Sequence, residues 1–169
     1  VQALSTAQVA AMFNEQIAAM TTAQVVAIET RDLVSMNADA IGSMTTAQIA
    51  AMTSEQVNQL TSTQVQSLNA AQLSGMTTSQ IVALQTTQTS SLYGQQVASL
   101  TTAQLVVLET RDLAALSNDA IQALTTAQVA SLTTTQVEAL NTAQVGALQN
   151  SQLLALTTSQ VVALTTRQA

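Results

Sequence analysis

The chain has 169 residues; 47% are apolar but only 1% are aromatic, and Cys, His, Pro and Trp are absent. Its net charge is −6, with nine acidic and three basic residues. This balance argues against nucleic-acid and anionic-membrane partners, because no cationic patch is available to neutralise phosphates. Without Cys and His, disulfides, thiol chemistry, the commonest general base and the soft metal ligands are also missing.

An eight-residue repeat runs through the chain from its first residues without a change of register. Gln stands at every eighth position from 8 to 168, except at Asp32, Ala40, Asp112 and Ala120. The unit is Thr-Thr-Ala-Gln-Val-x-Ala-Leu, and it is clearest at 21–28 and 125–132. Self-similarity at a fixed period is typical of solenoids and arrays, so we interpret residues 1–169 as one continuous repeat domain.

We number the repeat positions as columns one to eight, with Gln in column four. Columns five and eight are apolar from Val9 to Val161 and from Leu4 to Leu164, apart from Thr89 in column five. A strand would place these two columns on opposite faces, whereas a helix places them about 60° apart on one face. Ala, Gln and Leu are also good helix formers. The columns therefore predict helices and no β-sheet.

A single long helix does not fit the eight-residue period. Its apolar stripe would rotate by about 80° with each repeat and could face no fixed partner. Thr-x-x-Gln is a capping box, in which the Thr hydroxyl and the Gln side chain satisfy helix-start N–H groups. A helix start is expected in each repeat, at Thr-Thr pairs such as 21–22, 45–46, 101–102 and 125–126.

Helices this short require stacking against neighbouring repeats, because two buried aliphatic side chains do not offset the ordering of eight residues. The sequence therefore predicts an all-α solenoid with about three to four repeats per turn. Columns five and eight should line a dry axis, and column six should be the most exposed. Aspartate at Val129 or Leu132 should destabilise strongly, and at Ala130 only mildly.

In chain order, the first departure from the unit is a charged segment at Glu29–Asp32. The same Glu-Thr-Arg-Asp sequence returns at Glu109–Asp112, and residues 29–44 match 109–124, which defines an 80-residue super-repeat. Calcium binding by Glu29, Asp32 and Asp39 is one interpretation, but the spacing is not that of an EF-hand loop. Acidic helix starts with local ion pairs to Arg31 and Arg111 are the interpretation we favour. Ala40 and Ala120 stand in place of Gln, so their repeats should lack the hydrogen bond between the Gln side chain and the N–H at the helix start.

The next irregular segment is Thr89–Gly94, where Thr89 interrupts an apolar column and Tyr93 stands in a capping position. It is interpreted as either a local defect or a contact site. The six Met residues all substitute for Leu in column eight, which indicates core packing and not haem or copper ligation. No catalytic, cofactor-binding or metal-binding residues are predicted, and no cofactor is expected.

The chain starts at Val1 and stops at Ala169 in the middle of a repeat. Capped solenoids end in atypical polar repeats, and none is present here. We therefore expect these residues to belong to a longer array, or to associate end to end with further copies. No apolar run approaches the ~20 residues of a membrane-spanning helix, so membrane insertion is not expected.

The Thr-Thr-Ala-Gln-Val-x-Ala-Leu unit resembles octapeptide-repeat regions of very long bacterial surface or secreted proteins, often labelled haem-utilisation or adhesion proteins. This resemblance implies an extracellular or cell-surface location. A haem function finds no support in the residues, because His and Cys are absent and Tyr93 is the only Tyr.

Two functions are compatible with these observations. The first is a structural segment, such as a stalk, spacer or filament element, and the second is a repetitive binding surface in which the Thr columns contact a polymer or ice. If the chain binds ice, it should lower the freezing point relative to the melting point. This thermal hysteresis should disappear when Thr102, Thr126 and Thr134 are replaced. We expect no such activity. An enzyme is not expected.

Overall fold

A computed structural model describes residues 5–164, and every regular element in that range is a short helix. The helices of the first half are α1 (Thr6–Ala10), α2 (Asn14–Ala18), α3 (Thr22–Val26), α4 (Thr30–Ser35), α5 (Ala38–Gly42), α6 (Thr46–Ala51), α7 (Ser54–Gln59), α8 (Ser62–Gln66), α9 (Ala70–Gly75) and α10 (Thr78–Val82). Those of the second half are α11 (Thr86–Thr89), α12 (Gly94–Ser99), α13 (Thr102–Val107), α14 (Thr110–Ala114), α15 (Asn118–Gln122), α16 (Thr126–Ser131), α17 (Thr134–Ala139), α18 (Thr142–Ala147), α19 (Asn150–Ala155) and α20 (Thr158–Ala163). The predicted all-α fold with one helix start per repeat is confirmed.

The capping box explains where the helix begins in most of the described repeats. In α16, the Thr125 hydroxyl accepts a hydrogen bond from the N–H of Gln128, and the side-chain oxygen of Gln128 accepts one from the N–H of Thr125 at 2.7 Å. Two extended residues, Leu132 and Thr133, then connect α16 to α17. Backbone in the β region suits a β-branched residue such as Thr. The chain therefore bends once in every repeat, without a positive φ angle at any described residue.

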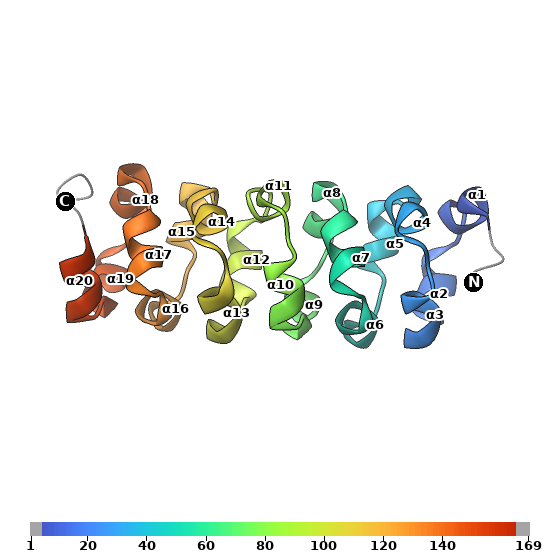
Figure 1. The fold of residues 1–169 in the computed structure, drawn as a ribbon, viewed down its shortest axis with the longest axis horizontal. Helices are drawn as coiled ribbons and strands as arrows, with labels where there is room; N and C mark the ends of the chain where they lie inside the picture. Colours follow the sequence, from blue (N-terminus) through green and yellow to red (C-terminus); the bar gives the residue numbers. More distant parts are fainter. Residues whose placement is uncertain (1–4, 165–169) are drawn as a thin grey trace.

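The helices coil into a rod, with the described ends of the chain at opposite ends of the long axis (Figure 1). Helices three apart in sequence pack together, as α13 does with α16 and α16 with α19. Side-chain hydrogen bonds between neighbouring coils join residues 25 to 31 positions apart, as from Asn58 to Ala83 and from Gln80 to Ile49. One turn therefore contains between three and four repeats, as predicted.

One cluster of aliphatic side chains fills the axis of the coil. In the middle of the rod, column five (Val97, Leu105, Leu113) and column eight (Leu100, Leu108) are buried, as expected. Four Met residues, Met36, Met44, Met52 and Met76, lie in the same core. Thr89 is also fully buried, and its hydroxyl donates to the carbonyl of Thr86 at 3.0 Å. Its polar group is satisfied within its own helix.

One expectation about the faces of the helix is wrong, and the burial of one further column was not predicted. Column four is buried together with columns five and eight, as Gln104 and Gln128 show. Column six is not the most exposed column, because column three is exposed in every described repeat while several column-six residues are half-buried. The reason is that column six faces the next coil, where the Asn58 amide donates to the carbonyl of Ala83 at 2.8 Å. Both differences arise from contacts between turns.

Candidate functional site

The most regular polar feature is a ladder formed by the column-four glutamines. In Gln104, the side-chain oxygen accepts from the N–H of Thr101 at 2.8 Å. Its amide nitrogen donates to the carbonyls of Leu73 and Met76, at 2.8 and 2.7 Å, in the preceding coil. One side chain therefore starts its own helix and binds the C-terminal end of the helix four before it. The Leu73 carbonyl also accepts from the N–H of Met76, so the Gln104 amide adds a second hydrogen bond there and supplies one to the Met76 carbonyl at the helix end.

The same arrangement recurs along the rod. The glutamines that both cap a helix and donate to the preceding coil are Gln48, Gln56, Gln64, Gln72, Gln80, Gln88, Gln96, Gln104, Gln128, Gln136, Gln144, Gln152 and Gln160. In the first coil, Gln16 and Gln24 cap their helices but remain exposed. The capping role was predicted from the sequence, whereas the contact between coils was not.

The ladder is interrupted where aspartate replaces glutamine. Asp112 is buried, and its carboxylate accepts from the Thr86 hydroxyl at 2.5 Å. Asp32 makes the equivalent contact with Thr6. Both lie in the first turn of a helix, as expected, but neither caps the helix start with its side chain. The shorter aspartate side chain therefore exchanges the contact with the preceding carbonyls for one with a Thr hydroxyl.

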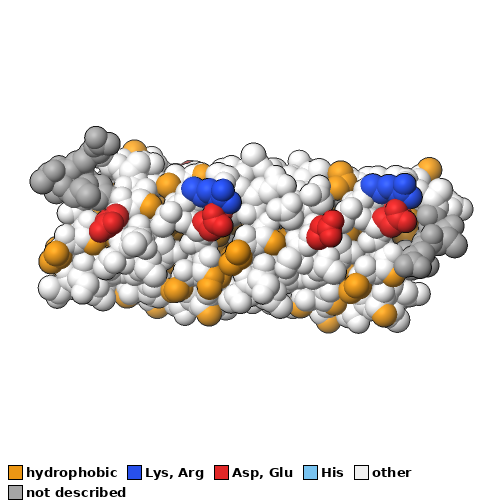
Figure 2. Space-filling model, in the orientation of Figure 1, with side chains coloured by type: hydrophobic (Ala, Val, Ile, Leu, Met, Phe, Trp, Pro, Cys, Tyr) orange, Lys and Arg blue, Asp and Glu red, His pale blue; other side chains and the backbone are white. Residues whose placement is uncertain are grey.

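Ion pairs surround both aspartates, as the sequence predicted. The Arg111 guanidinium lies 2.8 Å from Glu109 and 3.7 Å from Asp112. Arg31 makes the corresponding pairs with Glu29 and Asp32 at 2.9 and 3.6 Å. Figure 2 shows the described arginines in two places on the same face of the rod, each beside acidic side chains. Most of each Arg side chain is exposed, so these pairs contribute little to stability.

Ala40 and Ala120 also interrupt the ladder. Each is buried and lacks an amide, so the reach-back contact is missing, as predicted. The helix starts are still capped, because the side chains of Asn37 and Ser117 accept from the N–H groups of Ala40 and Ala120.

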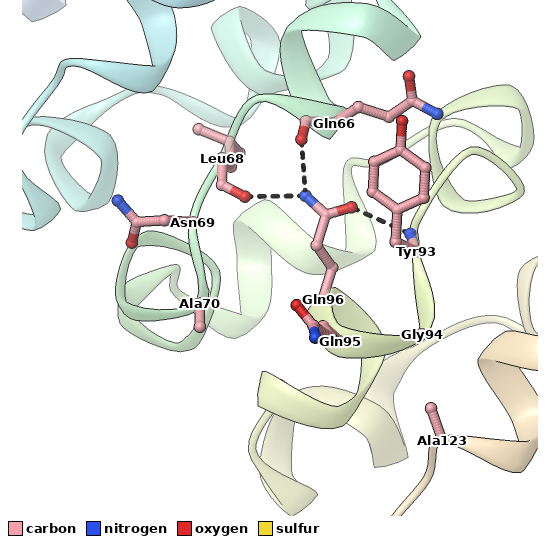
Figure 3. A pocket seen from close by; sticks show the side chains of 9 residues that line it. All are labelled: Gln66, Leu68, Asn69, Ala70, Tyr93, Gly94, Gln95, Gln96 and Ala123. Carbon is pink, nitrogen blue, oxygen red and sulfur yellow. Dashed lines mark hydrogen bonds between the residues drawn. The ribbon is translucent and has the colours of Figure 1, made fainter.

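A cavity beside an irregular segment lies next to Tyr93. It has a volume of about 580 Å³ and is lined by Gln66, Leu68, Asn69, Ala70, Tyr93, Gly94, Gln95, Gln96 and Ala123. Figure 3 shows Tyr93 and Asn69 on opposite sides of the Gln96 amide, which is bonded to the carbonyls of Gln66 and Leu68. Gly94 allows the close approach of α12 to α15, because a Cβ atom there would lie 2.9 Å from that of Ala123.

The other aromatic residue, Phe13, lies 80 residues before Tyr93, in the same column, and both side chains are exposed. Sequence reasoning considered Tyr93 alone. The super-repeat period, already visible in the charged segments, could have paired the two positions.

Among residues 5–164, no group of three or more His, Cys, Asp or Glu side chains could hold a metal ion. No helix in this range is both long and apolar enough to cross a membrane.

Comparison with protein families gives one match. A family described as the ALTTAQ repeat matches residues 1–27, 25–62 and 105–142, which together make up more than half of the chain. The second and third matched segments are themselves 80 residues apart, in agreement with the super-repeat. No curated protein matches the chain.

Proposed function

The chain belongs to the ALTTAQ repeat family, and from this premise we propose that it is a non-enzymatic structural segment, a stalk, spacer or filament element. The observation that supports this function most directly is the glutamine ladder. From Gln48 to Gln160, buried amides join each coil to the one before it. Charge-neutral bonds of this kind resist changes in salt concentration, which suits a rod that keeps its length outside a cell.

We further propose that the rod belongs to an extracellular or surface protein of a bacterium. The proposal rests on the resemblance of the octapeptide unit to repeats of such proteins. An antibody raised against the chain should label intact source cells. Labelling only after lysis would contradict this location.

The coil is also suited to continuation along its axis, either within a longer chain or by end-to-end contact with further copies. At the C-terminal coil, Leu154 and Val162 are 87% and 79% exposed. At the opposite end, Gln16 and Gln24 cap their helices and have no donor contact to another described coil. A coil placed before them would supply the carbonyls that the other glutamines bind.

A length variant tests the structural function. Inserting a second copy of residues 45–124 after Leu124 preserves both the octad and the super-repeat. Small-angle scattering should then show a rod longer by about 24–30 Å, three coils at helix-packing distance, with the same cross-section. A concentration series should show lengthening at constant cross-section if copies stack. A cross-section that grows with the insertion would contradict a spacer, because the added coils would not continue the rod.

The alternative of a Thr-based binding surface has less support. Column-one hydroxyls, such as those of Thr101 and Thr125, accept the capping hydrogen bonds. Successive Thr pairs also follow the turns of the coil around the rod, so they do not form one flat array.

A further inference from the structure

The two aromatic residues of the chain occupy equivalent, exposed positions. Phe13 is 71% exposed and Tyr93 is 59% exposed, and both replace the usual column-one Thr. In a solenoid with a well-packed axis, an exposed aromatic ring contributes nothing to the core. Its presence at the same point of both super-repeats requires another explanation.

The two rings face the same side of the rod. Contacts between neighbouring coils span 25 to 31 residues, so 80 residues correspond to about three turns. The charged segments obey the same period, and the described arginines do lie on one face (Figure 2). At 8–10 Å between packed helices, Phe13 and Tyr93 are separated by about 24–30 Å along the axis.

The cavity at Tyr93 is uncharged and rich in amides. None of the residues that line it is charged. The Gln66 amide lies beside the Tyr93 ring, and Asn69 and Gln95 contribute further amide groups to the lining (Figure 3). Within residues 5–164, the Tyr93 hydroxyl, the Asn69 amide nitrogen and the Gln95 amide make no hydrogen bond to another protein group. The cavity volume of about 580 Å³ falls within the range of small-ligand pockets.

We propose that Phe13 and Tyr93 are stacking platforms for a neutral polysaccharide lying along the rod. Sugar rings present C–H faces that pack on aromatic rings, and hydroxyls that exchange hydrogen bonds with amides. A nucleic acid would also stack, but the net charge of −6 and the absence of a cation at the cavity disfavour phosphates. Two sites on one face bind a polymer more tightly than either site alone.

Native gels containing dextran, hydroxyethyl cellulose or galactomannan test this proposal. The wild-type chain should be retarded by at least one of these neutral polymers. Phe13→Thr and Tyr93→Thr restore the repeat consensus, so circular dichroism should be unchanged. Each should weaken retardation about tenfold, and the double variant should abolish it. Tyr93→Phe keeps the ring and should remain within about twofold of wild type.

The intrinsic fluorescence of the chain reports on Tyr93, because it is the only Tyr and Trp is absent. Soluble fragments of the polymer that retards the chain should change its fluorescence, and Phe13→Thr should leave that local response in place. Retardation by alginate alone, no retardation by any neutral polymer, or a folded double variant that migrates like wild type would each overturn the proposal. None of these outcomes affects the spacer function, which the length variant tests separately.

Discussion

At the scale of single residues, the column-four glutamine combines two tasks that are usually separate. Its oxygen completes a capping box, and its nitrogen satisfies carbonyls at the end of another helix. Glutamate could perform the first task but not the second, because a carboxylate has no donor. A mutation that changes the amide alone therefore separates helix capping from the joining of coils.

Gln104→Glu is expected to destabilise the rod by about 2–4 kcal/mol, because a buried carboxylate would face the carbonyls of Leu73 and Met76 without donating. Gln24→Glu is the matched control. Gln24 is exposed and only caps, and glutamate is acceptable at that position. Urea unfolding measures both variants. If Gln104→Glu and Gln24→Glu have equal free energies of unfolding, the contact between coils contributes little.

At the scale of the element, each helix is too short to be stable alone. The helices contain four to six residues, whereas isolated helices need about 12–15 to persist in water. A cap fixes where most of these helices begin, and packing on the third helix before and after supplies the remaining stability. Space between coils therefore limits which residues a helix accepts.

Two glycines in column six test this limit. Gly146→Ala should raise the free energy of unfolding by up to about 1 kcal/mol, since alanine favours helix and nothing lies within 4 Å of the added Cβ. At Gly42, the Cβ would lie 2.9 Å from the backbone carbonyl oxygen of Ser67. Gly42→Ala should therefore be less stable than Gly146→Ala when both are melted under the same conditions. Identical gains would mean that the coils separate without cost.

At the scale of the whole molecule, the rod is a one-dimensional stack in which each coil contacts only its neighbours. Stability in such a chain is approximately a sum of repeat and interface contributions. A mutation in the core should therefore destabilise the adjacent coils and leave distant coils intact, unlike a core mutation in a globular domain.

Val129→Asp should destabilise strongly, because an unpaired charge would enter the apolar axis, where Val129 is 1% exposed. Hydrogen exchange should quicken in α13, α16 and α19, which pack together, while α3 to α6 stay protected. Ala130→Asp, one residue later and exposed, should change stability by less than about 0.5 kcal/mol. Loss of protection along the entire rod would show global cooperativity instead.

The sequence by itself determined the local structure of this protein. Thr-x-x-Gln and the spacing of columns five and eight specify a helix start and an apolar face within eight residues, so the helix boundaries and most of the core could be predicted. The charged segments likewise form ion pairs between near neighbours such as Glu109 and Arg111.

Only the tertiary structure decided which residues meet across coils. The number of residues per turn depends on how bends and side-chain volumes combine over several repeats, and no single octad contains that information. It places the amide of Gln104 on the carbonyl of Met76, turns column six toward the next coil, and sets Asp112 against Thr86. The inferred placement of Phe13 and Tyr93 on one face depends in the same way on the coil, because 80 residues correspond to about three turns.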